Sequence, residues 1–132
     1  MGRVLALDYG TVRIGVAVSD PLRITAQPLD VVFVGDLDAR LPDLVQDVDE
    51  IIVGLPTSLD GTEGPSAVAA REFARRVEQL TGIAVRMIDE RFTTSDAQRA
   101  LLEGGVRRKR RKDVVDKVAA ALLLEGYLGT GT

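Results

Sequence analysis

The stretch Arg3–Asp20, RVLALDYGTVRIGVAVSD, is the part of the sequence that most restricts the fold. An apolar run, Val4–Leu7, stops at Asp8, and a short turn containing glycine leads into a second apolar run, Ile14–Val18. Two such runs joined by a tight turn predict a β-hairpin. Because a continuous apolar strand is buried on both faces, a charged residue at its end must reach water or meet a counter-charge. Asp8 is therefore a candidate cation ligand at the mouth of the hairpin.

The composition predicts one compact domain and restricts its chemistry. The chain has 132 residues, of which 45% are hydrophobic, and this fits a single domain spanning residues 1–132. The absence of cysteine and histidine excludes disulfides, thiolate zinc sites, cysteine nucleophiles and histidine bases. Carboxylates, hydroxyls and basic side chains remain, and sites built only from oxygen ligands favour Mg²⁺ or Mn²⁺.

No apolar run approaches the roughly 18 residues that a membrane helix needs. The first residues enter the predicted hairpin without a hydrophobic segment of the signal-peptide type. We therefore expect a soluble, cytoplasmic protein without membrane contact.

The remaining elements are predicted from periodicity and turn residues. Three more strands are predicted at Ala26–Val34, Ile51–Val53 and Ile83–Ile88; Pro28 favours an edge position for the first, and the last has the composition of a buried parallel strand. Helices are predicted within Asp36–Asp49, from Pro65 to Gly82, from Thr93 to Gly104, and from Asp113 to Leu128. This order predicts an α/β fold with a mixed five-stranded sheet, three antiparallel strands followed by two parallel ones, with helices packed on it. That arrangement is typical of ribonuclease H-like folds.

Three carboxylates are predicted to meet at one edge of this sheet. Asp8 ends the first strand, Glu90 lies just past the fifth, and Asp116 is placed in the first turn of the last helix, where the helix dipole would favour its charge. Because neighbouring carboxylates raise one another's pKa values, the cluster stays ionised only beside a cation. Two divalent ions held there can activate a water and stabilise a leaving oxygen in phosphodiester cleavage.

Each carboxylate also has a simpler interpretation. Asp8 can be a solvated surface acid, Glu90 can pair with Arg91 or give its role to Asp89, and Asp116 can be an ordinary acid at a helix start. Only their joint placement favours a metal site.

The positive charges of the chain are unevenly distributed. The net charge is −3, yet Arg107–Lys112, RRKRRK, carries six positive charges, which leaves about −9 on the rest. We predict that this run is a loop that holds phosphates without reading base sequence; the alternative is a solvated loop. Arg13 and Thr57 are further candidates, although a surface ion pair and an ordinary turn explain them equally well. The predicted nucleic-acid contacts are thus Arg13, Thr57, Arg107, Arg108, Lys109, Arg110, Arg111 and Lys112.

Four segments in order resemble the motifs of the YqgF/RuvX family, whose members are described as Holliday junction resolvases or pre-16S rRNA nucleases. The segments are LALDYGTVRIGVAVSD (Leu5–Asp20), VGLPTSLDGTEGPSA (Val53–Ala67), DERFTTSDA (Asp89–Ala97) and VDKVAAALLLEGYL (Val115–Leu128). The resemblance implies a fold close to the RuvC resolvases and a divalent-metal site. Its metal carboxylates correspond to Asp8, Glu90 and Asp116. Phe92 stands where members commonly have leucine, and the basic run is heavier than the pattern requires.

The leading hypothesis is a metal-dependent nuclease acting on structured RNA, namely the 5′ end of precursor 16S rRNA. A Holliday junction resolvase is the first alternative, and it would require a homodimer, whereas RNA trimming is compatible with a monomer. A non-catalytic nucleic-acid-binding module is the second. The turn Asp8–Thr11 is also similar to the phosphate-binding hairpin of actin-like ATPases, but those proteins bind nucleotide between two such domains, and this chain has length for one.

Overall fold

The computed structural model describes residues 2–56, 64–89 and 108–129, with side chains in the last range from residue 118 onward. The strands are β1 (Arg3–Tyr9), β2 (Arg13–Ser19), β3 (Ala26–Phe33), β4 (Val48–Leu55) and β5 (Val85–Asp89). The helices are the short 3₁₀ helix η1 (Val34–Asp36), α1 (Leu37–Leu44), α2 (Pro65–Thr81) and α4 (Arg108–Leu128). The helix predicted from Thr93 to Gly104 lies outside the described residues. No helix in the described ranges is long and apolar enough to cross a membrane.

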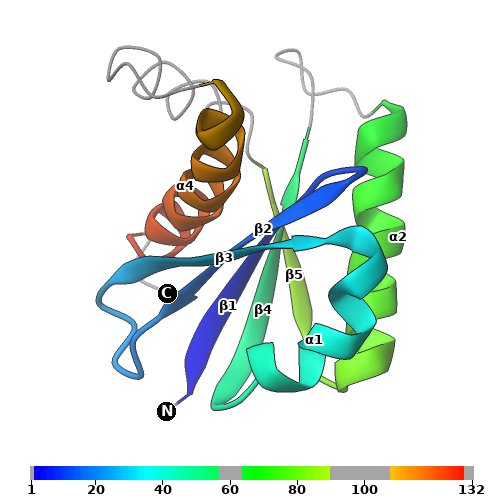
Figure 1. Cartoon of the computed structure of the whole chain (residues 1–132). Coiled ribbons are helices and arrows are strands. Elements are labelled where there is room, and N and C mark those ends of the chain that lie inside the picture. The colour runs from blue at the N-terminus through cyan, green and yellow to red at the C-terminus, as the bar shows by residue number, and fades with distance from the viewer. Residues whose placement is uncertain (1, 57–63, 90–107, 130–132) are drawn as a thin grey trace.

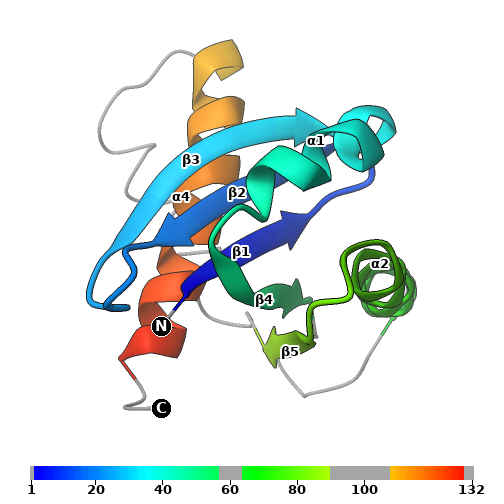
Figure 2. The same cartoon turned by 90° about the horizontal axis from the view of Figure 1, so that it is seen from below.

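The five strands form one mixed sheet in the order β3-β2-β1-β4-β5. β1 pairs antiparallel with β2 and β2 with β3, whereas β1–β4 and β4–β5 are parallel. The predicted sheet is therefore confirmed, including the edge position of β3, which contains Pro28. Figures 1 and 2 show α4 on one face of the sheet and α1 and α2 on the other.

Alternate residues of the central strands enter two separate cores. On one face, Leu5 and Leu7 of β1 pack with side chains of α1 and α2, including Phe73. On the other face, Val4 and Ala6 pack with α4. The face covered by α1 and α2 is called the α2 face, and the face covered by α4 is called the α4 face. This alternation assigns every other residue of β1 to the same face.

Two glycines serve the tight turns that the sequence predicts. A Cβ on Gly10 would lie 2.6 Å from the backbone oxygen of Arg13, so the hairpin turn has no room for a side chain. Gly82 ends α2 in the left-handed region, at φ 71°, as predicted. Pro65 is the first residue of α2, where its missing N–H has no consequence.

Three predicted elements differ from the structure. α1 ends at Leu44, and Val48, predicted as helical, opens β4, because Asp47 at φ 62° turns the chain into the sheet. The prediction of a buried fifth strand is wrong: among the described strands β5 lies at the edge of the sheet, and none of its residues is fully buried. Leu80 continues the apolar periodicity of α2, which favours burial, but it is 53% exposed.

The start of the last helix is a larger correction. α4 begins at Arg108, so the basic run from Arg108 to Lys112 is helical rather than a loop. Arginine and lysine are good helix formers, and this run contains neither glycine nor proline to stop a helix. Asp116 consequently lies in the third turn of α4, too far from the helix start for the dipole effect that was predicted.

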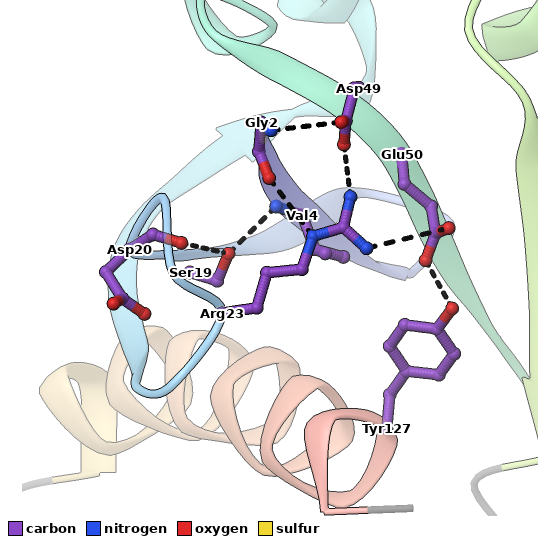
Figure 3. Close-up of polar contacts among 8 residues, drawn as sticks. All are labelled: Gly2, Val4, Ser19, Asp20, Arg23, Asp49, Glu50 and Tyr127. Carbon is purple, nitrogen blue, oxygen red and sulfur yellow. Dashed lines mark hydrogen bonds and ion pairs between the residues drawn. The ribbon is translucent and has the colours of Figure 1, made fainter. Parts of the chain in front are cut away.

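A polar network closes the sheet edge where β1 and β4 begin (Figure 3). Arg23 donates to the Gly2 carbonyl over 3.1 Å and forms ion pairs with Asp49 and Glu50. The hydroxyl of Tyr127, near the end of α4, donates to Glu50. The network therefore attaches the last turn of α4 to the first residues of β4.

Candidate functional site

Asp8 is the penultimate residue of β1, the central strand of the sheet. Its Cα pairs with Gly15 of β2, and the preceding residue, Leu7, pairs with Val53 of β4. Because Val4 and Ala6 belong to the core beneath α4, the alternation places the half-buried Asp8 on the α4 face. Strand pairs on both sides thus determine where this carboxylate lies.

The carboxyl ends of β1, β4 and β5 lie at the same edge of the sheet, since these strands are mutually parallel. Asp89, the last residue of β5, pairs with Leu55. Val85 and Met87 pack on the α2 face, so the alternation places Asp89 there too, on the face opposite Asp8. Glu90 follows directly in the sequence and lies outside the described residues.

The described residues contain only part of the predicted metal site. Within the described part of the chain, no group of three or more acidic side chains is arranged to hold a metal ion. Of Asp8, Glu90 and Asp116, however, only Asp8 has a described side chain, while Asp116 contributes its backbone position in α4. The metal site therefore stays a prediction.

Of the predicted nucleic-acid contacts, too, some lie within the described residues and others outside them. Arg13 is the first residue of β2. Every second residue of a strand points to the same face, so Arg13 shares a face with Gly15 and with Ala17, which belongs to the core beneath α4. Arg13 therefore lies on the α4 face with Asp8. Arg108 to Lys112 form the beginning of α4. Figure 1 shows the first turns of α4 at the edge of the sheet where β4 and β5 end. Thr57 and Arg107 lie outside the described residues.

One surface feature at this edge was missed by sequence reasoning. Phe33, the last residue of β3, is 58% exposed, and its Cα pairs with Arg13. An aromatic residue at the end of an apolar run gives no sign of exposure. Its face depends on the irregular register between Val16 and Ala17, which the sequence does not reveal.

The opposite face carries a separate hollow of about 420 Å³ between α1 and α2. Tyr9 and Phe73 form its aromatic wall, with ring centroids 4.6 Å apart, and Asp38 and Arg76 form an ion pair at its side. Asp8, the predicted metal ligand whose side chain is described, does not line this hollow.

Comparison with known proteins identifies the family of the chain. The sequence model of the family described as RuvX, Holliday junction resolvase, matches residues 2–130. The chain belongs to the RuvX family. It is 49% identical over 133 residues to a protein of Paracoccus denitrificans, covering 96% of this chain and 84% of the relative. It is 47% identical over 132 residues to one of Moorella thermoacetica, covering 96% and 94%. Both relatives carry the name "Putative pre-16S rRNA nuclease".

The fold is also found in a solved structure. RuvC of Thermus thermophilus in complex with Holliday junction substrate superimposes with a TM-score of 0.60 at 19% identity, covering 100% of this chain and 98% of RuvC. RuvX membership and the RuvC likeness together confirm the ribonuclease H-like fold that the element order predicts.

Proposed function

We propose that this protein is a divalent-metal-dependent nuclease that hydrolyses phosphodiester bonds in precursor 16S rRNA. The observation that carries the proposal is Asp8, a carboxylate at the carboxyl end of the central strand in a chain 49% identical to a relative named as a pre-16S rRNA nuclease. An rRNA substrate would place the protein in the cytoplasm, where ribosomes are assembled.

Asp8, Glu90 and Asp116 are the proposed metal ligands. The assignment of Glu90 is supported by the sequence, in which it directly follows Asp89, the last residue of β5 at the carboxyl edge of the sheet.

The direction of α4 supports the third ligand. Tyr127 is attached to Glu50 at the start of β4, so α4 runs from the carboxyl edge of the sheet toward its amino edge. Asp116 lies eleven residues before Tyr127, about 16 Å at the helical rise, and Asp8 lies about 13 Å along β1 from Val4, which pairs with Glu50. Asp116 also precedes the buried Ala120 by four residues, about one helical turn. The similar lengths of about 16 Å and 13 Å support the assignment of Asp116 as a ligand beside Asp8.

The donor set fits Mg²⁺ or Mn²⁺, because all three ligands are carboxylates and the chain has no histidine or cysteine. Divalent ions bound there would polarise the attacking water and neutralise charge on the leaving oxygen. The chain itself holds Asp8 in a fixed position through the pairing of β1 with β2 and β4, and Arg108 to Lys112 at the start of α4 supply charge for the neighbouring phosphates.

A nuclease assay with Mn²⁺ or Mg²⁺ tests the proposal on labelled precursor rRNA, single-stranded DNA and a four-way DNA junction. We expect cleavage of the RNA by the parent and by Asp43→Asn, which removes an exposed acid of α1, and none by Asp8→Asn. Equal cleavage by Asp8→Asn would refute the assigned site. RNA binding without metal-dependent cleavage would instead favour a non-catalytic binding module.

Metal binding can be measured independently of cleavage. Mn²⁺ should raise the melting temperature of the parent and of Asp43→Asn, but not that of Asp8→Asn, because an ion that binds only the folded protein stabilises it. An equal rise for Asp8→Asn would place the ion elsewhere.

The second candidate is cleavage of four-way DNA junctions, favoured by the family description and by the likeness to RuvC. That reaction requires paired symmetric cuts and hence a homodimer. Preferential cleavage of the junction, together with a dimeric mass in solution, would support it over the RNA substrate.

A further inference from the structure

Phe33 is exceptional among the aromatic residues that the structure describes. Tyr9 and Phe73 pack against each other, and Tyr127 is buried over the sheet, whereas 58% of Phe33 is exposed. Val12 in the adjacent turn is also 58% exposed, and the Val34 N–H donates to its carbonyl over 2.9 Å. The surface around the exposed Phe33 ring, at the end of β3, is called here the rim.

The rim lies on the same face and edge as Asp8. Phe33 pairs with Arg13, and paired residues of an antiparallel ladder point to the same face, which for Arg13 is the α4 face. Asp8 pairs with Gly15, and Gly15 pairs with Val31, two residues before Phe33. Two strand spacings and two residue rises separate Phe33 from Asp8, a Cα distance of about 12 Å.

The chemistry of the rim suits an unpaired nucleotide. A phenyl ring offers a stacking surface to any base, and the arginine paired with it offers charge to the adjoining phosphate. A distance of about 12 Å corresponds to roughly three or four nucleotides at the stacked rise of a nucleic-acid strand. A strand whose scissile phosphate lies at Asp8 can therefore reach the rim without leaving this face.

We propose that Phe33 is a stacking platform for an unpaired base of the substrate strand, a few nucleotides from the scissile bond, with Arg13 contacting the phosphate beside that base. The inference rests on the proposed function, because the position of the strand is set by cleavage at Asp8. It adds a specificity: the substrate must offer a single-stranded nucleotide at the rim.

The chain lacks tryptophan, so Phe33→Trp introduces a single indole whose emission reports directly on stacking. We expect saturable quenching of this emission when a single-stranded RNA of about 12 nucleotides is titrated in the presence of EDTA, which prevents metal-dependent cleavage. Leu80→Trp is the matched control, since Leu80 is 53% exposed near the end of α2, and its emission should stay unchanged.

Kinetics provide the second measurement. Phe33→Ala should raise KM for RNA about tenfold and leave kcat close to that of the parent, because base stacking contributes to binding in the ground state as well. Phe33→Tyr should restore the parental KM. An RNA with one abasic site at the stacked position should show the same KM with the parent and with Phe33→Ala.

The outcomes separate the two proposals. If labelled RNA binds Phe33→Trp with parental affinity by anisotropy while the indole emission does not change, the platform is refuted and the nuclease assignment stands. If the parent neither binds nor cleaves RNA, the nuclease assignment fails and the platform fails with it.

Discussion

Gly10 is the residue on which the geometry of the hairpin at Asp8 depends. Its backbone is not in the left-handed region, so the requirement for glycine is purely steric: a Cβ would lie 2.6 Å from the carbonyl oxygen of Arg13. That oxygen belongs to the backbone and cannot turn away as a flexible side chain would. The turn therefore tolerates a side chain only if β1 and β2 shift.

Gly10→Ala should lower the free energy of unfolding by about 1–3 kcal/mol, the usual cost of overpacking. Urea unfolding measures this as a lower midpoint with an unchanged slope. Gly126→Ala is the control: Gly126 is an exposed residue inside α4 with open space around it, and alanine there should raise stability by roughly 0.5–1 kcal/mol. Equal midpoints for the two variants would contradict the steric explanation.

The hydroxyl of Tyr127 links the last turn of α4 to the sheet. Donation of its hydroxyl hydrogen bond to Glu50 raises the pKa of Tyr127 above its ordinary value of 10.0, and burial and the Glu50 charge act in the same direction. A pKa raised by folding stabilises the folded state at every pH below the ordinary value. That contribution is lost as the pH rises above 10 through the folded pKa.

Tyr127→Phe should therefore cost about 1 kcal/mol of unfolding free energy at pH 8, where the hydrogen bond is intact. The difference from the parent should shrink between pH 10 and the raised pKa. Urea unfolding at several alkaline pH values checks both, with Tyr9→Phe as the control for loss of a tyrosine hydroxyl. A difference that stays constant with pH would contradict the assigned role of the hydroxyl.

Among the elements, α4 determines whether the proposed metal site is assembled, because it carries Asp116. Its described contact with the sheet combines large residues such as Leu124 with small ones, and Ala120 is fully buried against the core that contains Val4 and Ile52. Small side chains allow the helix axis to approach the sheet closely. The distance between α4 and β1 then follows from the size of these residues.

Ala120→Leu should move α4 away from the sheet, lower stability by about 1–3 kcal/mol and reduce cleavage more than the loss of folded protein explains. Thermal unfolding and kcat on the same preparation test this. Glu125→Ala, an exposed change on the same helix, should stay within about 0.5 kcal/mol of the parent and leave kcat unaltered. Full activity of folded Ala120→Leu would show that α4 does not position a ligand.

At the scale of the whole molecule, charge is divided between a basic segment and an otherwise acidic chain. The six residues Arg107–Lys112 are the main positive feature of a protein whose net charge is −3. Binding that depends on phosphate contacts weakens with salt, by a slope of about −0.7 per contact for single strands. Affinity for RNA should therefore be strongly dependent on ionic strength despite the negative net charge.

Replacing Arg110 and Arg111 with alanine should reduce the slope of log K against log salt by about 1.4. Replacing Arg75 and Arg76, exposed residues of α2, the helix on the opposite face of the sheet, removes the same charge and should leave the slope near that of the parent. Fluorescence anisotropy from low to moderate salt measures both. Equal reductions would mean that net charge, and not the basic segment, governs binding.

Periodicity and turn residues predicted much of the fold because they act locally. The apolar runs on either side of Gly10 gave the hairpin, and Pro65 and Gly82 gave the ends of α2. Local signals failed where packing or neighbouring strands decide: β5 has the composition of a buried strand yet lies at the edge. α4 likewise extends back to Arg108, although a run of positive charge was interpreted as a loop.

By itself the sequence determined the mixed sheet, the oxygen-only chemistry that follows from the absence of histidine and cysteine, and Asp8 at the end of an apolar strand. Only the tertiary structure decided which residues share a face. Asp8 in β1 and Asp89 in β5 lie at the same edge of the sheet but on opposite faces. Phe33 and Asp8, in contrast, lie on the same face. The physical reason is that a strand reverses its side chains at every residue, so a face follows from the register of paired strands, and register is set by contacts distant in sequence.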